Sequence, residues 1–181
     1  MKKLNKLFFI SIIIVTSFAF NSCDPFDELY LTLAMDTRFE TIAPVSNVFL
    51  TSSICLSEFD DYEDNNDRLK VIKYISAAYF TLSSSNGLNG NMRLKLYQGN
   101  TNTLLFEFND SNFNADLYLT KPMKINLTQQ EVNNINTYLT NPKVDKCFRA
   151  ELEVLNANDN DGPPFQLNGK VEFLTELQIE P

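Results

Sequence analysis

The chain has 181 residues, of which 44% are hydrophobic, 12% aromatic and 21% charged, which is the composition of a globular domain rather than of a disordered or fibrous chain. It contains no His and no Trp, so no imidazole is available as a general base, a metal ligand or a pH switch. From Asp24 onward, 12 basic and 23 acidic residues give a net charge of −11. That charge repels phosphate backbones, and we expect no nucleic-acid partner.

The N-terminus reads as an export signal. Three lysines precede an uncharged run of 14 residues, Leu7 to Phe20, which suits a secretory signal and is shorter than the ~20 residues that span a bilayer. The sequence Asn21-Ser22-Cys23 then resembles the lipobox of bacterial lipoproteins, with Phe20 in place of the usual leucine. We therefore expect residues 1–22 to be a lipoprotein signal peptide, 23–28 a lipidated cysteine with a short tether, and 29–181 one domain. An ordinary secreted protein, cleaved near the same place, is the alternative.

In a lipoprotein of this type, Cys23 carries a diacylglycerol and fatty acyl chains such as palmitate. Two or three chains, at about 0.8 kcal/mol per buried methylene, hold a protein on a membrane almost irreversibly. Asp24, Asp27 and Glu28 directly behind the cysteine resemble the acidic residues of Bacteroidota lipoproteins that travel to the outer membrane. We expect an outer-membrane protein and leave open which leaflet it occupies and whether it is surface-exposed.

The two other cysteines, Cys55 and Cys147, allow a single pairing in an oxidising compartment. A bridge would close a loop of 92 residues and favours the folded state by roughly 4 to 5 kcal/mol in the chain-entropy model. Two buried thiols that act as small apolar residues are the alternative.

The mature chain is dominated by strand patterns. Alternation of apolar and polar residues predicts strands at the following positions: Leu29–Met35, Val48–Leu56, Tyr74–Ser83, Met92–Tyr97, Leu104–Phe108, Phe148–Val154 and Phe165–Ile179. The turn cluster Asn86–Asn91 predicts a hairpin, and Tyr74–Phe108 as a whole a meander. We expect an all-β fold, a two-layer antiparallel β-sandwich with Ig-like or Greek-key connections, with a small barrel as the alternative.

One or two short helices accompany these strands. Thr128 and Glu131 form a capping box, with Leu127 and Val132 placed as a hydrophobic staple, so we expect a helix that ends before Asn141 and closes an open end of the sheets. A weaker helical turn is predicted over Asp67–Ile72. This order of elements resembles a group of small Bacteroidota outer-membrane lipoproteins of unassigned role, which implies a sandwich fold and gives no catalytic residues to carry over.

Three sets of residues are candidate sites. Two acidic segments offer oxygen ligands for Ca²⁺: the first contains Asp60, Asp61 and Asp64, and the second Asn158, Asp159 and Asp161. Neither segment has the EF-hand pattern, so a solvated loop is the simpler interpretation. Arg93, Lys95 and Tyr97 share the polar face of one strand, where we expect Tyr97 to be exposed. They form either a recognition face, for example for a glycan, or an ordinary solvated face.

No nucleophile and base, phosphate loop or zinc spacing stands out, and carboxylate chemistry such as glycoside hydrolysis is the only enzymatic alternative. We therefore expect a non-enzymatic lipoprotein without a cofactor. The first hypothesis for its role is that of an accessory or scaffold subunit, with outer-membrane proteins as partners. A surface glycan-binding module for nutrient capture is the second hypothesis.

Overall fold

The computed structural model describes residues 28–99 and 101–180. Eight strands make up most of this part: β1 (Leu29–Ala43), β2 (Val48–Cys55), β3 (Leu69–Ser84), β4 (Asn89–Gln98), β5 (Leu104–Asn114), β6 (Met123–Ile125), β7 (Cys147–Asn158) and β8 (Phe165–Ile179). Four short helical segments connect them: η1 (Leu56–Glu58), α2 (Asp60–Glu63), η2 (Ala115–Tyr118) and α3 (Gln129–Tyr138). In this part of the chain no helix is long and apolar enough to cross a bilayer. The predicted signal peptide and Cys23 lie outside the described residues.

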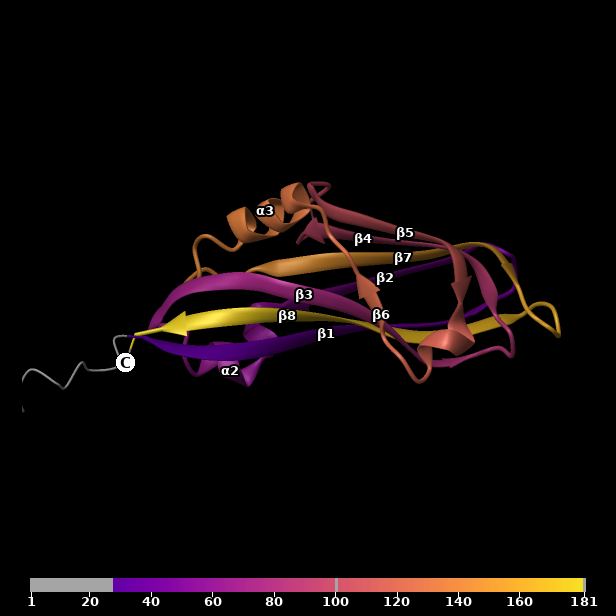
Figure 1. Cartoon of the computed structure of the whole chain (residues 1–181), viewed down its shortest axis with the longest axis horizontal. Coiled ribbons are helices and arrows are strands. Elements are labelled where there is room, and N and C mark those ends of the chain that lie inside the picture. Colours follow the sequence, from indigo (N-terminus) through magenta and orange to yellow (C-terminus); the bar gives the residue numbers. More distant parts are fainter. Residues whose placement is uncertain (1–27, 100, 181) are drawn as a thin grey trace, which may run out of the picture.

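The strands form two antiparallel sheets of four, in the orders β1-β8-β3-β6 and β2-β7-β4-β5. Figure 1 shows these sheets as two stacked layers. The pairs are nested, because β1 pairs with β8, β2 with β7, β3 with β6 and β4 with β5. Eight strands in this nesting are a jelly roll, which is built from Greek keys. The prediction of an all-β, two-layer sandwich is confirmed, and its connections follow the Greek-key rather than the Ig-like order.

The central strand β8 shows why this sequence makes a sandwich. All eight residues of odd number from Phe165 to Ile179 are buried, while those between them are at least partly exposed. β8 pairs with β1 without interruption, from Leu29 opposite Ile179 to Ala43 opposite Phe165. Because side chains alternate across a strand, this parity turns one complete face toward the core.

Two predictions of local structure are wrong. β3 and β4 belong to different sheets, so Asn86–Asn91 contains a crossover and not a hairpin turn. β3 already has β8 and β6 as neighbours, and Leu88, within the connection, is fully buried between the layers. For the same reason β3, β4 and β5 are not a meander, although β4 and β5 do pair as predicted.

The segment Asp67–Ile72 is not helical but enters β3 at Leu69. Leu69 and Ile72 are both buried, and their spacing of three suggested a helix. A register shift between Leu69 and Val71 inserts one extra residue into the strand, which lets two positions of opposite parity face the core. The acidic segment before it contains the short helix α2 instead.

The predicted helix is α3, and its capping box between Thr128 and Glu131 is confirmed. Within the described part of the chain, β6 pairs only with Ala77–Tyr79, so the preceding part of β3 lacks a strand neighbour on that side. The amide oxygen of Asn136 accepts a hydrogen bond of 2.9 Å from the backbone N–H of Tyr74 there. On the other sheet, Asn134 donates to the carbonyl of Leu105 in the edge strand β5. The helix thus satisfies exposed backbone groups of both sheets, which protects these edges.

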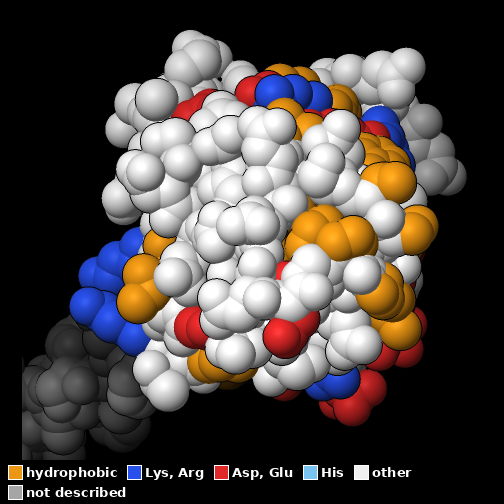
Figure 2. Space-filling view, turned by 90° about the vertical axis from the view of Figure 1, so that its right-hand side faces the viewer, with side chains coloured by type: hydrophobic (Ala, Val, Ile, Leu, Met, Phe, Trp, Pro, Cys, Tyr) orange, Lys and Arg blue, Asp and Glu red, His pale blue; other side chains and the backbone are white. Residues whose placement is uncertain are grey.

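The two ends of the sandwich differ in character. The end that contains the start of β1 and the finish of β8, which we call the terminal pole, lies on the left in Figure 1. The opposite end, the far pole, carries the connections 44–47, 85–88 and 159–164. Figure 2 views the far pole directly, and uncharged polar side chains and backbone make up most of that face. β1 has 15 residues, so at about 3.3 Å per residue the poles are roughly 50 Å apart.

Candidate functional site

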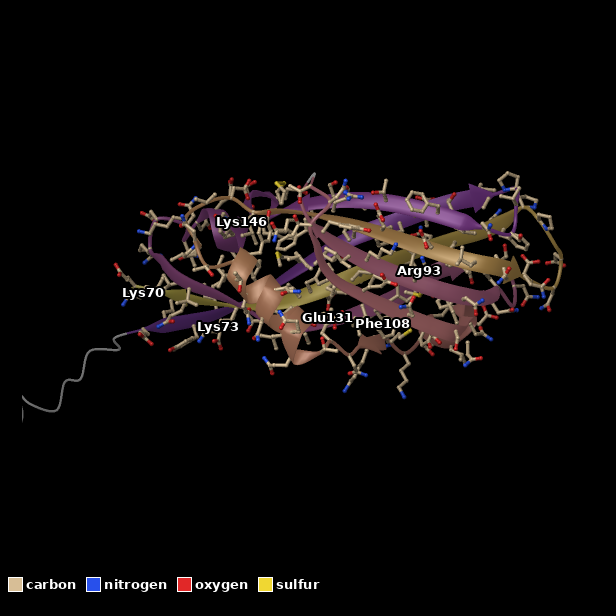
Figure 3. The ribbon with its side chains drawn as sticks, turned by 90° about the horizontal axis from the view of Figure 1, so that it is seen from above. Lys70, Lys73, Arg93, Phe108, Glu131 and Lys146 are labelled. Atoms are coloured by element: carbon tan, nitrogen blue, oxygen red, sulfur yellow. A yellow bond between two sulfur atoms is a disulfide. The ribbon has the colours of Figure 1, made fainter. Side chains whose placement is uncertain are left out.

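The predicted recognition residues lie on the outer face of the β2-β7-β4-β5 sheet, where Figure 3 labels Arg93. The guanidinium of Arg93 lies 3.3 Å from the carboxylate of Glu153 and 3.8 Å from that of Glu107. Lys95 stands between Glu107 and Glu151 in the strand register. The basic side chains of this face are therefore matched by carboxylates on the neighbouring strands, which leaves little net charge to attract an ionic ligand.

Tyr97 differs from its prediction, because it is only partly exposed. The guanidinium carbon of Arg149 lies 4.2 Å from the centre of its ring, and Arg149 also forms an ion pair with Glu151. Burial, followed by the nearby charge of Glu151, raises the pKa of Tyr97. A ring covered by a guanidinium group on one side has lost one of the two faces on which a sugar could stack.

Cys55 and Cys147 form a disulfide and lie directly opposite each other in the register of β2 and β7. Beside the bridge, the carboxylate of Asp145 accepts hydrogen bonds from the backbone N–H and the hydroxyl of Ser57, at 3.0 and 2.7 Å. The two sulfurs and this carboxylate are close enough to share a metal ion. Bridged sulfurs are not thiolates, however, so this arrangement is a covalent link between strands and not a metal site.

The acidic candidates are not brought together as a metal site. Asp60, Asp61 and Asp64 are all exposed along the single turn of α2 and its C-terminal cap. In the other segment, Oδ1 of Asp159 accepts hydrogen bonds from the backbone N–H groups of Asp161 and Gly162. Such bonds are those of a side chain that shapes a turn. Within residues 28–99 and 101–180, neither segment gathers three carboxylates close enough to hold one ion.

The interior holds a small apolar cavity between α3 and the two sheets. Met35, Ile54, Ile135 and Phe173 are among its lining residues, and its volume is about 10 Å³. A single water needs about that much space together with polar partners. This cavity is a packing defect and offers no room for a ligand.

A larger hollow lies on the surface near the far pole, at the start of β4 and the ends of β5 and β7. It has a volume of about 450 Å³, within the range of small-ligand sites. We call it the amide groove, because five of the eight described residues that line it are asparagines: Asn89, Asn91, Asn112, Asn114 and Asn156, with Gly90, Ser111 and Phe113. A second hollow of about 170 Å³ continues it along β4 and β5 and shares Asn91 and Ser111.

The amide groove exists because the strands are irregular at this point. Register shifts interrupt the pairing of β4 with β5 after Gly90, and with β7 after Asn89. A Cβ at Gly90 would lie 2.9 Å from the carbonyl oxygen of Leu155, so only glycine allows β4 and β7 to approach this closely. Asn156 has a φ of 55°, a left-handed conformation that asparagine tolerates better than most residues.

The amide groove is not predicted by any pattern in the sequence. Asn86–Asn91 has the composition of a turn, and Asn156 belongs to none of the predicted site residues. The available signal was the density of asparagines in two separate segments, Asn86–Asn91 and Asn109–Asn114. Only the pairing of β4 with β5 places these segments side by side.

No protein-family model and no curated protein matches this sequence. Among solved structures, the chain is similar to those of Desmodium yellow mottle tymovirus and tobacco necrosis virus. The first has a TM-score of 0.36, 9% identity, and coverage of 84% of this chain and 90% of the viral one. The second has a TM-score of 0.38, 11% identity, and coverage of 84% and 97%. A third similar structure, a particle of Macrobrachium rosenbergii nodavirus, has a TM-score of 0.39, 10% identity, and coverage of 88% of this chain and 98% of the viral one. At these TM-scores the similarity supports no inference about function.

Proposed function

We propose that this protein is a non-enzymatic lipoprotein of the outer membrane that serves as an accessory or scaffold subunit of a membrane-protein assembly. The observation that carries the proposal is the short distance between the anchor and the fold. Leu29 begins β1 at the terminal pole, six residues after Cys23. Six extended residues reach at most about 20 Å. A lipid on Cys23 therefore holds the terminal pole against the membrane, beside whatever proteins occupy it.

This placement makes the side walls of the sandwich the surfaces that meet neighbouring proteins. On β1 and β3, Ile42, Ile75 and Leu82 are 64%, 50% and 43% exposed. Exposed aliphatic side chains on a rigid sheet are suitable contact points for a protein partner, although single exposed residues are common on any surface. The net negative charge of the mature chain disfavours nucleic acid and anionic lipid headgroups as alternatives.

Extraction of native membranes in mild detergent tests the proposal. We expect a partner of fixed stoichiometry to co-purify, and mass spectrometry to find a diacylated N-terminal cysteine at position 23. The variant Cys23→Ser should appear in the soluble fraction without the partner, and Ile75→Glu should weaken the complex more than Thr32→Glu, a matched change at another exposed strand position. Recovery of the wild-type protein only as a lone monomer would contradict a scaffold role, and a lipid-free N-terminus would contradict the anchor.

A second candidate function is surface glycan binding, and the amide groove is the observation that favours it. With the terminal pole at the membrane, the amide groove lies toward the far pole, at the end of the sandwich that is distant from the lipid. Retention of the full-length protein on a neutral polysaccharide gel is the basic test of this candidate. Absence of retention on every polysaccharide tried would leave the scaffold role as the single proposal.

A further inference from the structure

We propose that the amide groove binds a neutral glycan through its hydroxyl groups. The proposal rests on the second candidate function and assigns its site to Asn89, Asn91, Asn112, Asn114 and Asn156 rather than to the face around Tyr97. Each asparagine offers two donors and one acceptor, with two acceptor lone pairs. Sugar hydroxyls both donate and accept, so a cluster of amides matches adjacent hydroxyls without requiring any charge.

The absence of charge in the amide groove defines the ligand class. None of the described residues that line it is acidic or basic, and the surrounding far pole is mostly uncharged in Figure 2. In the adjoining hollow, Arg93 is paired with Glu107 and Glu153. Asp110, in the same hollow, accepts hydrogen bonds from Tyr118 and from the backbone N–H of Asn112. Uronic acids, sulfated sugars and phosphates would therefore find no free cation among the described residues of these two hollows, whereas a neutral sugar needs none.

Two of the amides are held in place with one end available. The Nδ2 of Asn89 donates to the carbonyl of Gly87 at 2.9 Å, and Oδ1 of Asn114 accepts from the backbone N–H of Asp116 at 3.0 Å. Across the described residues, neither Oδ1 of Asn89 nor Nδ2 of Asn114 has a further partner. Asn89 and Asn114 are directly opposite each other in the register of β4 and β5. An acceptor and a donor therefore lie side by side, ordered before any ligand arrives, which lowers the entropic cost of binding.

The side-chain amides of Asn91 and Asn156 form no hydrogen bond with the other described residues. Both residues are exposed, one on β4 and one on β7. Because the smaller hollow continues from Asn91 along β4 and β5, the combined hollow is elongated and suits a short run of sugar units rather than a single ring. Phe113 lines the floor but is only 1% exposed, so stacking contributes little, and we expect a dissociation constant in the range of about 0.1 to 1 mM.

The test uses the full-length protein in detergent and affinity electrophoresis through gels that contain one polysaccharide each. The neutral probes are laminarin, xyloglucan, glycogen and α-mannan, and the anionic probes are polygalacturonate and heparin. We expect retardation by at least one neutral probe and by neither anionic probe. Asn91→Ala and Asn112→Ala should each weaken binding about threefold to tenfold, which is the effect of one hydrogen bond. The matched control Asn133→Ala, an exposed asparagine of α3, should leave binding and the thermal transition unchanged.

The outcomes separate the site from the function. If a neutral probe retards the wild-type protein and Tyr97→Ala abolishes this while Asn91→Ala does not, the glycan function stands and the amide groove is the wrong site. If only the anionic probes retard the protein, the inferred ligand class is wrong. If no probe retards it, both the amide groove proposal and the second candidate function are overturned.

Discussion

Gly169 lies in the middle of β8, directly beneath the ring of Tyr79 on β3, and both residues are buried. A Cβ at Gly169 would lie 2.6 Å from Oη, 2.8 Å from Cε2 and 2.9 Å from Cζ of Tyr79. The ring cannot simply move away, because it makes edge contacts with the rings of Phe113 and Tyr118 at centroid distances of 5.7 and 6.3 Å. We therefore predict that Gly169→Ala destabilises the protein by overpacking its core.

The expected magnitude follows from two opposing effects. Inserting a methyl group into a well-packed core costs about 1 to 3 kcal/mol. Replacing glycine in a strand by alanine reduces the entropy of the unfolded chain and returns roughly 0.5 to 1 kcal/mol. The central values of these two ranges leave a net loss of about 1 kcal/mol in the free energy of unfolding, measured from urea unfolding curves of the oxidised protein.

The cause is tested by a double-mutant cycle with Tyr79→Phe, which removes the oxygen nearest to the new methyl group. If the clash with Tyr79 is the cause, Gly169→Ala should cost less in the Tyr79→Phe background, with a coupling of at least about 0.5 kcal/mol. The coupling should remain partial because two ring carbons still lie within 3 Å. Equal costs in the two backgrounds, or a Gly169→Ala variant as stable as the wild type, would refute the steric argument.

Three further predictions concern stability. The double substitution Cys55→Ser and Cys147→Ser removes a cross-link between residues 92 positions apart, and we expect the free energy of unfolding to fall by roughly 4 to 5 kcal/mol. The reduced wild-type protein should unfold at the same urea concentration as the variant. A loss below about 1 kcal/mol would contradict the loop-entropy argument. Asn136→Ala leaves the backbone N–H of Tyr74 in β3 without its acceptor, and we expect the free energy of unfolding to fall by about 1 to 3 kcal/mol. Asn136→Asp keeps an acceptor and should cost less. Similar losses in the two variants would show that this hydrogen bond is unimportant. Burial raises the pKa of Tyr74 and of Tyr79 to about 12. The unfolded chain releases these protons near pH 10, so their contribution to the free energy of unfolding is fully present below pH 10. For each tyrosine, the free energy of unfolding then falls by about 1.4 kcal/mol per pH unit as the pH rises toward 12. Tyr79→Phe should make the fall between pH 10 and 12 shallower, and an unchanged slope would exclude Tyr79 as a contributor.

Local chemistry allowed several elements to be predicted correctly. The parity of β8 needed only the alternation of apolar residues from Phe165 to Ile179, because a strand with one buried face must alternate. The start of α3 needed only Thr128 and Glu131, which satisfy backbone N–H groups within one turn.

Although burial acts to raise the pKa of Glu131, the hydrogen bonds that its carboxylate receives from Thr128 and from the backbone N–H of Glu107 lower it.

Other features depend on partners that are distant in sequence. Asn86–Asn91 has the composition of a hairpin turn, but a turn motif does not state whether the chain returns to the same sheet or crosses to the other. That choice follows from which neighbours β3 finds, and these are β8 and β6, which come later in the chain. The bulge that lets Leu69 and Ile72 both face inward is likewise visible only against β8.

The amino-acid sequence by itself predicted seven of the eight strands of the described residues, all except the three-residue strand β6. It also determined the α3 cap, the single possible pairing of Cys55 and Cys147, and the expectation of an anchor at Cys23, because each depends on neighbouring residues or on a count. The tertiary structure alone decided the jelly-roll pairing, the matched charges around Arg93 and the assembly of the amide groove. These depend on contacts between strands that lie far apart in the chain, and such contacts are selected by the packing of the whole core rather than by any local pattern.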